Sequence, residues 1–361
     1  MPDDANGNGR SVTLAEVARL AGVSRATGSR VLNGSPKVSP EARRSVEDAI
    51  AALGYVPNRA ARSLVTRRSD SIGVIIPEPT GRVFADPFFG LFLAGIGTAL
   101  AGRGLQLVLL TAQSREQEKR LEQYVAAGHI DGVVLTSLHG RDPLPERLAA
   151  RGVPVVVSGR PPGRARASYV DADSRGGGRA ATTHLIAQGR RTIATISGSL
   201  DMPAAHDRLV GYREALEAAG LATDPSLEEA GDFSPERAAR AMTRLLARRP
   251  DLDAVFVASD SMAVAALDVL QRAGRRVPED VAVVGFDDQP IVTTTRPTLT
   301  SVRHPIQAMS EEMVRLLVHA IDTRDRTPRH VVFPTELVVR ESSGAPAARS
   351  EALRAGGQND R

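Results

Sequence analysis

The stretch "VTLAEVARLAGVSRATGSRVLNG", residues 12–34, decides the fold of the first part of the chain. Thr13 followed by Glu16 forms a capping box, the signature of a helix N-terminus. Apolar residues then recur at helical spacing along one face: Leu14, Val17, Ala18 and Ala21. Gly22 supplies a turn residue that ends this helix, and Ser24 caps a second helix two residues later. The stretch therefore predicts two short helices that meet at a tight glycine turn.

A third short helix is predicted from "SPEA", with Ser39 as its cap and Pro40 at its first position, and it ends at Gly54. Three such helices are typical of a helix-turn-helix domain, whose second helix lies in the major groove of DNA. Charge supports this reading, because residues 1–68 carry a net charge of +5 and the rest of the chain carries −1. A small helical bundle that contacts another protein is the alternative.

Composition excludes several classes of function. The chain has no cysteine, and its 7 histidines are scattered, so we expect no disulfide, no metal site and no cofactor. No apolar stretch approaches the ~20 residues of a membrane span, and we expect a soluble, cytoplasmic protein without membrane contact. No phosphate-binding loop, nucleophile elbow or catalytic triad is recognisable, so we expect no enzyme. The glycines of "DSRGGGRA", residues 173–180, fit either a phosphate cradle or the start of a helix.

From about residue 70, short β-branched runs alternate with amphipathic stretches, which indicates parallel sheets with crossover helices. The series is long enough for two consecutive open α/β lobes that divide near "YVDADSRGGG", residues 169–178. Ligands of such sheets bind beyond the carboxyl ends of the strands, so a two-lobed protein closes on a ligand between its lobes.

Three segments resemble the N-terminal signature of the LacI/GalR family of bacterial transcription regulators: residues 12–34, "VSPEARRSVEDAIAALGYVPNRAARSL" and "SDSIGVIIPE". Later segments resemble the core of the same family, among them "DPFFGLFLAGI", "DRLVGYREAL" and "VASDSMAVAAL". The resemblance implies an all-α helix-turn-helix head followed by a two-lobed α/β core, similar to periplasmic binding proteins, with parallel sheets.

The resemblance also implies domain boundaries. We expect the head at 11–57, a hinge helix and linker at 58–69, and an effector-binding core at 70–343. Within the core we expect a first lobe of about 70–171 and 300–328, and a second lobe of about 172–299 and 329–343. The strand at 299–304 and the helix after it are expected to return to the first lobe, and "VVFPTELVVRES" to close the second. Residues 1–10 and 344–361 are expected to be disordered.

By the same resemblance, the second helix and the hinge contact DNA. The positions that match base-reading residues are Arg25, Ala26 and Arg30, and arginine can read guanine by paired hydrogen bonds. Phosphate or structural positions are matched by Thr13, Ser24, Thr27, Ser29 and Asn33, and hinge positions by Asn58, Arg59, Arg62 and Leu64. Leu64 matches a leucine that wedges between central base pairs in the minor groove. Solvated phosphate contacts for Arg25, and a plain basic linker for the hinge, remain open alternatives.

Gly28 falls where the family usually has a valine that packs the second helix on the first. The replacement costs about 1 kcal/mol of helix propensity and on the order of 1.5 kcal/mol of apolar burial. We therefore expect a head that is partly loose when free and is ordered by DNA.

Eight positions match the effector pocket of the family: Phe88, Phe89, Arg160, Asp173, Arg208, Phe233, Ser259 and Asp287. Arginine and carboxylate bind vicinal hydroxyls, and aromatic faces cover the apolar side of a sugar ring. The alternatives are a surface role for Arg208 and a core role for Phe88 or Phe89. Asp86, Gly159 and Ser259 depart from the usual pattern and put a simple hexose in doubt, which leaves a nucleoside, a larger glycoside or a sugar derivative.

Together these observations predict a sequence-specific DNA-binding regulator, a repressor controlled by a small sugar-like effector between the core lobes. Its predicted partners are a near-palindromic double-stranded operator, the effector and a second copy of the chain in a homodimer. The alternative is a sugar- or nucleoside-binding protein without specific DNA regulation.

Overall fold

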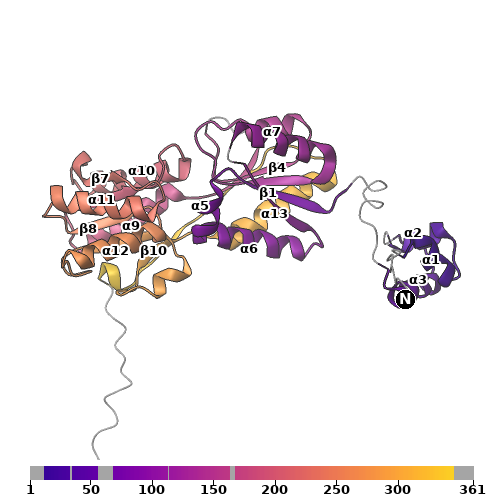
Figure 1. The fold of residues 1–361 in the computed structure, drawn as a ribbon. Coiled ribbons are helices and arrows are strands. Elements are labelled where there is room, and N and C mark those ends of the chain that lie inside the picture. The colour runs from indigo at the N-terminus through magenta and orange to yellow at the C-terminus, as the bar shows by residue number, and fades with distance from the viewer. Residues whose placement is uncertain (1–11, 33–34, 56–67, 113, 163–166, 345–361) are drawn as a thin grey trace, which may run out of the picture. The chain divides into compact units, whose positions relative to one another are not determined.

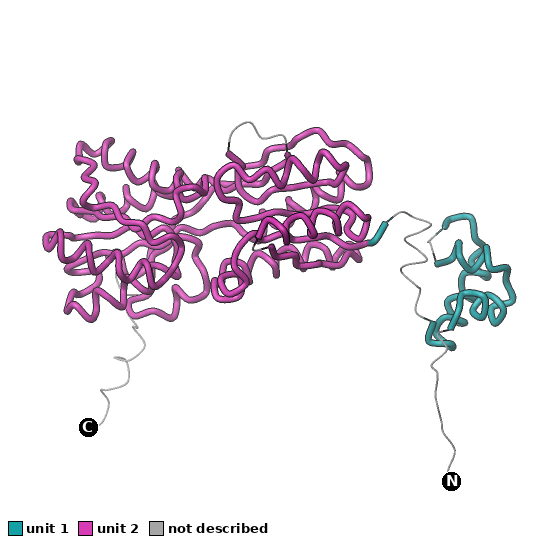
Figure 2. The backbone as a smooth tube through the Cα atoms, turned by 45° about the horizontal axis from the view of Figure 1, so that its top comes forward, with its two compact units in different colours: residues 1–69 teal, residues 70–361 magenta. Residues whose placement is uncertain are grey.

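The chain divides into two compact units, residues 1–69 and 70–361, which Figure 2 shows in different colours. The computed structural model describes residues 12–32, 35–55, 68–112, 114–162 and 167–344. Within these residues, no helix combines the length and the apolar character that crossing a membrane requires.

The first unit holds three helices: α1 (Leu14–Leu20), α2 (Arg25–Leu32) and α3 (Pro40–Leu53). The predicted helix ends are confirmed, because Thr13 and Glu16 form the capping box and Ser39 caps α3. Gly22 and Gly54 adopt the left-handed conformation, with φ of 66° and 58°. The core that the three helices share is small and consists of Val17, Val31, Val46 and Ala49.

Gly28 is buried where α2 crosses α1. A Cβ atom placed there would lie 3.4 Å from Leu14 Cδ1 and 3.6 Å from the Cβ of Ala18, which are ordinary contact distances. The space at this crossing therefore admits one methyl group, because Leu14 already lies close to the glycine. The full volume of a valine would need Leu14 to move.

The second unit has two lobes (Figure 1). The first lobe is built on a six-stranded parallel sheet with the order β11-β5-β4-β3-β1-β2. Its strands are β1 (Ser71–Ile76), β2 (Gln106–Thr111), β3 (Gly132–Leu135), β4 (Val155–Ser158), β5 (Ser168–Ala172) and β11 (His330–Phe333). The helices of this lobe are α5 (Thr80–Ala85), α6 (Pro87–Ala101), α7 (Arg115–Tyr124), α8 (Leu144–Ala150) and α13 (Ile306–Thr323). The apolar runs predicted as buried strands form the middle of the sheet, as the fully buried Ile72, Val74 and Val134 show.

The second lobe is built on another six-stranded sheet, with the order β12-β10-β9-β8-β6-β7. Its strands are β6 (Ile193–Ser197), β7 (Glu228–Ala230), β8 (Ala254–Val257), β9 (Ala282–Asp287), β10 (Thr300–Arg303) and β12 (Glu336–Val338). The helices are α9 (Ser174–Ala187), α10 (Pro203–Ala218), α11 (Pro235–Arg248) and α12 (Asp260–Arg272). All strand pairs are parallel except that of β12 with β10.

Two strands near the end of the chain lie in the opposite lobe from the one expected. β10 pairs in parallel with β9 in the second sheet, so the return to the first lobe begins only with α13. β11 pairs with β5 in the first sheet, and only β12 belongs to the second. β10 lies between β9 and β12 in the second sheet and β11 at the edge of the first, whereas the expected boundaries put each crossing one strand too early. The chain therefore passes between the lobes after β5, after β10 and after β11.

The glycines of "DSRGGGRA" serve helix packing. A Cβ on Gly178 would lie 2.3 Å from the carbonyl oxygen of Arg208 in α10, and one on Gly211 would lie 2.1 Å from that of Arg175 in α9. One on Gly177 would lie 2.7 Å from the ring of Phe286. Because these glycines have no side chains, α9 and α10 can approach each other closely. The close packing favours the interpretation of this segment as the start of a helix over that as a phosphate cradle.

We predict that Gly28→Ala raises the free energy of local unfolding of α2 by about 1 kcal/mol, because the methyl group fits and alanine favours the helix. Hydrogen exchange of the α2 amides in the full chain measures this as a slowing of about fivefold. Gly22→Ala is the matched control. It also meets open space, but its φ of 66° strains an alanine, so exchange should accelerate. Unchanged exchange in Gly28→Ala would contradict the packing described here.

Candidate functional site

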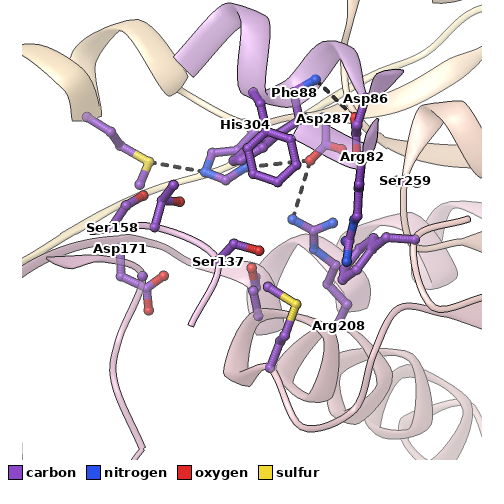
Figure 3. Close-up of a pocket in the computed structure, with 18 residues that line it drawn as sticks. Arg82, Asp86, Phe88, Ser137, Ser158, Asp171, Arg208, Ser259, Asp287 and His304 are labelled. Atoms are coloured by element: carbon purple, nitrogen blue, oxygen red, sulfur yellow. Dashed lines mark hydrogen bonds and ion pairs between the residues drawn. The ribbon is translucent and has the colours of Figure 1, made fainter. Parts of the chain in front are cut away.

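A cavity lies between the two lobes of the second unit and encloses about 680 Å³ of free space, its open mouth included. Figure 3 shows its lining, to which the carboxyl ends of strands in both sheets contribute along with residues of several helices. The first lobe contributes Thr136 and Ser137 after β3 and Ser158 in β4, and the second contributes Ser259 after β8 and Asp287 in β9. This is where open parallel sheets bind ligands, and the size suits a small molecule.

A buried ion pair forms one wall of the cavity. Arg208, in α10, donates from Nη2 to Asp287 Oδ1 at 3.4 Å and from Nη1 to the carbonyl of Ala258 at 2.5 Å. Its guanidinium stacks on the ring of Phe286, 3.6 Å from the centroid. Burial lowers the pKa of Arg208, although the carboxylates around it oppose this shift. Nε has no hydrogen-bond partner in the described part of the chain, so a donor is left for a ligand.

The backbone that carries Asp287 is strained and is held by its neighbours. Asp287 has a φ of 108° and Asp288 one of 53°, which non-glycine residues rarely adopt. Asp260, fully buried at the start of α12, accepts from the backbone N–H of Gln289 at 2.7 Å and from the Ser301 hydroxyl at 2.6 Å. Burial raises the pKa of Asp260 well above its usual value. These bonds fix the loop that presents the Asp287 carboxylate to the cavity.

Aromatic rings line opposite sides of the cavity. Phe88, at the start of α6 in the first lobe, has its ring centroid 5.8 Å from that of His304, which directly follows β10. Phe233 lines the cavity from the second lobe, and the guanidinium of Arg82 lies 5.8 Å from the centroid of its ring. Gly198 makes room for this ring, because a Cβ there would lie 2.1 Å from Phe233. Flat apolar faces therefore accompany the polar groups.

Two further carboxylates line the cavity, Asp86 at the cap of α6 and Asp171 in β5. Burial is the largest influence on both and raises the pKa of each carboxyl. With Asp287 they make three carboxylates against the two guanidinium groups of Arg82 and Arg208. The polar lining is therefore richer in acceptors than in cations, which favours a neutral ligand with many O–H donors over an anionic one.

Six of the eight residues expected in the pocket line this cavity: Phe88, Phe89, Arg208, Phe233, Ser259 and Asp287. Arg208 does not lie on the helix surface, since it is 4% exposed, and Phe89 belongs to the first-lobe core as well as to the lining. The other two lie outside the cavity. Arg160 is exposed and donates to Asp207 at 2.5 Å, and Asp173 caps α9 through the N–H of Gly176 at 2.7 Å.

Several lining residues were not predicted, chiefly Arg82, Ser137, Asp171 and His304. Most of the missed polar residues directly follow or end a strand, so the rule that ligands meet the carboxyl ends of strands was the signal available. This rule could not place His304, because His304 follows β10 and we expected that strand to belong to the first lobe.

In the first unit, α2 exposes Arg25, Ala26 and Arg30, while Gly28 and Val31 face the core. Ser24 lies at the start of this helix and accepts from the N–H of Thr27 at 3.1 Å. Thr13 caps α1, and Ser29 is half-buried. Asn33, Asn58, Arg59, Arg62 and Leu64 lie outside the described residues. Arg25, at the start of α2, and Arg30, in its last turn, are therefore both exposed to solvent.

We predict that Arg208→Ala lowers the free energy of unfolding of the core by about 3–5 kcal/mol, because it leaves the Asp287 carboxylate buried without its cation. Arg213→Ala, on the same helix, is the control. Its ion pair with Glu228 lies at the surface, so little should change. Urea unfolding of both variants measures the difference. Equal losses of unfolding free energy in the two variants would show that burial of the Arg208–Asp287 pair does not increase its contribution to stability.

The chain matches two known protein families. Residues 13–58 match the bacterial regulatory proteins of the lacI family, and residues 182–343 match a periplasmic binding protein-like domain. It is 52% identical to the HTH-type transcriptional regulator CelR of Thermobifida fusca, over 92% of this chain and 98% of that protein.

Solved structures agree with these matches. The structure of a transcriptional regulator CelR-cellobiose complex is 50% identical, with a TM-score of 0.73 over 92% of this chain and 99% of that one. A Lac repressor dimer bound to operator and the anti-inducer ONPF is 27% identical, with a TM-score of 0.81 over 93% and 100%. With a relative this similar along nearly its whole length, the chain belongs to the LacI family of bacterial transcriptional regulators.

Proposed function

We propose that this protein is a repressor that binds a near-palindromic operator as a homodimer and releases or retains it according to a neutral, hydroxyl-rich effector in the interlobe cavity. The proposal that a small effector binds in the cavity rests on the Arg208–Asp287 pair, which is buried between aromatic rings at the carboxyl ends of both sheets. The exposed arginines of α2 and the similarity to an operator-bound repressor support the proposal that the protein binds an operator.

We propose a β-linked disaccharide of the cellobiose type as the effector. The most similar solved structures include a relative in complex with cellobiose. The lining favours this class, because carboxylates and hydroxyls accept from sugar O–H groups while phenyl rings cover the apolar ring faces. The excess of carboxylates over guanidinium groups disfavours a sugar phosphate or a nucleotide. A neutral nucleoside is the competing class.

The pocket-lining residues Phe88, Phe89, Arg208, Phe233, Ser259 and Asp287 are the proposed contacts to the effector. Arg25, Ala26 and Arg30 are the proposed contacts to bases. We further propose that the protein acts by binding alone, without catalysis, and that it works in the cytoplasm, where the chromosome lies.

The operator test uses fluorescence anisotropy with palindromic duplexes from the DNA beside the gene, against scrambled duplex at two salt concentrations. We expect a preference of about 1,000-fold or more for one palindrome, and a large loss on a duplex that holds one half-site. Arg25→Ala should relax sequence preference by about 1–3 kcal/mol. Equal, salt-sensitive binding to every duplex would favour a binding protein without specific regulation.

The effector test uses isothermal titration with cellobiose, glucose, cellobiose phosphate and adenosine. We expect cellobiose to bind most tightly, and Arg208→Ala to weaken it by about 10- to 100-fold, the effect of losing hydrogen bonds from a charged donor. Arg213→Ala, on the same helix but away from the cavity, should bind as the wild type does. Tightest binding of adenosine would assign the nucleoside class instead.

A further inference from the structure

Three loops meet at one edge of the interlobe cleft, next to the cavity. Glu78 follows β1 and His139 follows β3, both in the first lobe, while Asp201 lies between β6 and α10 in the second. His139 Nε2 lies 2.9 Å from Glu78 Oε1, and His139 Nδ1 lies 2.8 Å from Asp201 Oδ2. One imidazole ring therefore joins a carboxylate of each lobe.

The two distances determine the protonation state of the ring. A neutral imidazole donates from one nitrogen only, so its second nitrogen would place a lone pair against a carboxylate at hydrogen-bond distance. Only the imidazolium ion donates from both nitrogens. In agreement, the hydrogen bond to Glu78 and that to Asp201 raise the pKa of His139, although partial burial opposes them.

Glu78 anchors this group on the first-lobe side. Its side chain is 4% exposed and accepts from Ser137 Oγ at 2.5 Å and from Arg82 Nη1 at 2.9 Å. Burial alone would raise the pKa of Glu78, but the bonds from His139 and Ser137, with the charge of Arg82, hold it below the usual value. Glu78 is thus an ionised carboxylate, and the charged groups that face His139 are Glu78 and Asp201, with Arg82 beyond Glu78.

The other polar contacts here between the lobes do not titrate near neutral pH. The N–H of Gly140 donates to the backbone carbonyl of Asp201 at 3.0 Å, and Arg160 Nη2 donates to Asp207 Oδ2 at 2.5 Å. Amides and guanidinium groups keep their protons throughout this range, whereas histidine changes charge within it. Among the contacts at this edge of the cleft, His139 is therefore the one whose charge changes near neutral pH.

We propose that Glu78, His139 and Asp201 form an interlobe latch that closes with the uptake of a proton, so that a fall in pH favours the closed lobes. The latch lies outside the proposed effector contacts and does not depend on the identity of the effector. It is connected to the cavity through Glu78, because Ser137 and Arg82 are both part of the lining. Ser137 donates its hydrogen to Glu78, which leaves the lone pairs of its oxygen for a ligand donor.

The direction of the pH effect follows from linkage. The closed form binds the proton more tightly than the open form, because opening keeps the bond from His139 to Glu78 within the first lobe but breaks the bond to Asp201. The latch therefore contributes fully below the pKa of His139 in the open form, and its contribution is lost as the pH rises through the higher pKa of the closed form. Each unit by which the pKa of His139 in the closed form exceeds that in the open form changes the ratio of closed to open molecules about tenfold.

Energy transfer between two dyes tests this latch without effector or DNA. Because the chain has no cysteine, single cysteines can be placed at the exposed positions Arg120 in α7 and Arg272 in α12, one in each lobe. In the full chain we expect the closed population to fall severalfold between about pH 6 and about pH 8.5. His139→Gln should abolish this pH response.

Two further variants make the result specific. Asp201→Asn keeps the backbone bond from Gly140 but removes one carboxylate, so it should reduce the pH response even if His139→Gln folds poorly. His319→Gln is the matched control, since His319 also lies near a carboxylate, Asp325, but within the first lobe, and it should respond as the wild type does. A wild type without a pH response, or a full response in His139→Gln, overturns the latch. Either result leaves the operator and effector tests unaffected.

Discussion

The buried pair of Arg208 and Asp287 is the interaction on which the rest of the cleft depends. A guanidinium and a carboxylate are stable there only with each other and with further partners, which are the carbonyl of Ala258 and the face of Phe286. The Asp287 carboxylate is presented by a strained turn, which Asp260 and Ser301 stabilise through hydrogen bonds to Gln289 and Asp288. The chain therefore maintains a polar wall that a purely structural protein would replace with apolar packing.

Local features of the head were predictable because their causes are local. Thr13, Gly22, Ser39 and Gly54 each act within one helical turn, so the sequence alone identified the helix ends. Gly28 was different. Its helix was predictable, but how closely Leu14 would approach it depends on the crossing of two helices, which no single segment specifies.

In the core, the apolar runs predicted the strands, but the order of strands at the sheet edges is a non-local property. The local sequences of β10 and β11 do not specify a lobe, and only their pairing with β9 and β5 assigns them to one. The same holds for the site. Arg208 and Asp287 matched a family pattern, whereas Asp171 and His304 became visible as lining residues only once the sheets were assembled. Arg160 and Asp173 matched the pattern and yet lie outside the cavity, because Asp207 and the N-terminus of α9 bind them instead.

The chain crosses between the lobes after β5, after β10 and after β11. A single connection would act as a swivel and leave the lobes free to rotate in any direction. Three connections that do not lie on one point remove most of those rotations and leave mainly a bend about the line through them. Opening and closing of the cleft is then one mechanical coordinate. Any group that binds across the lobes therefore changes the same motion, however different its chemistry.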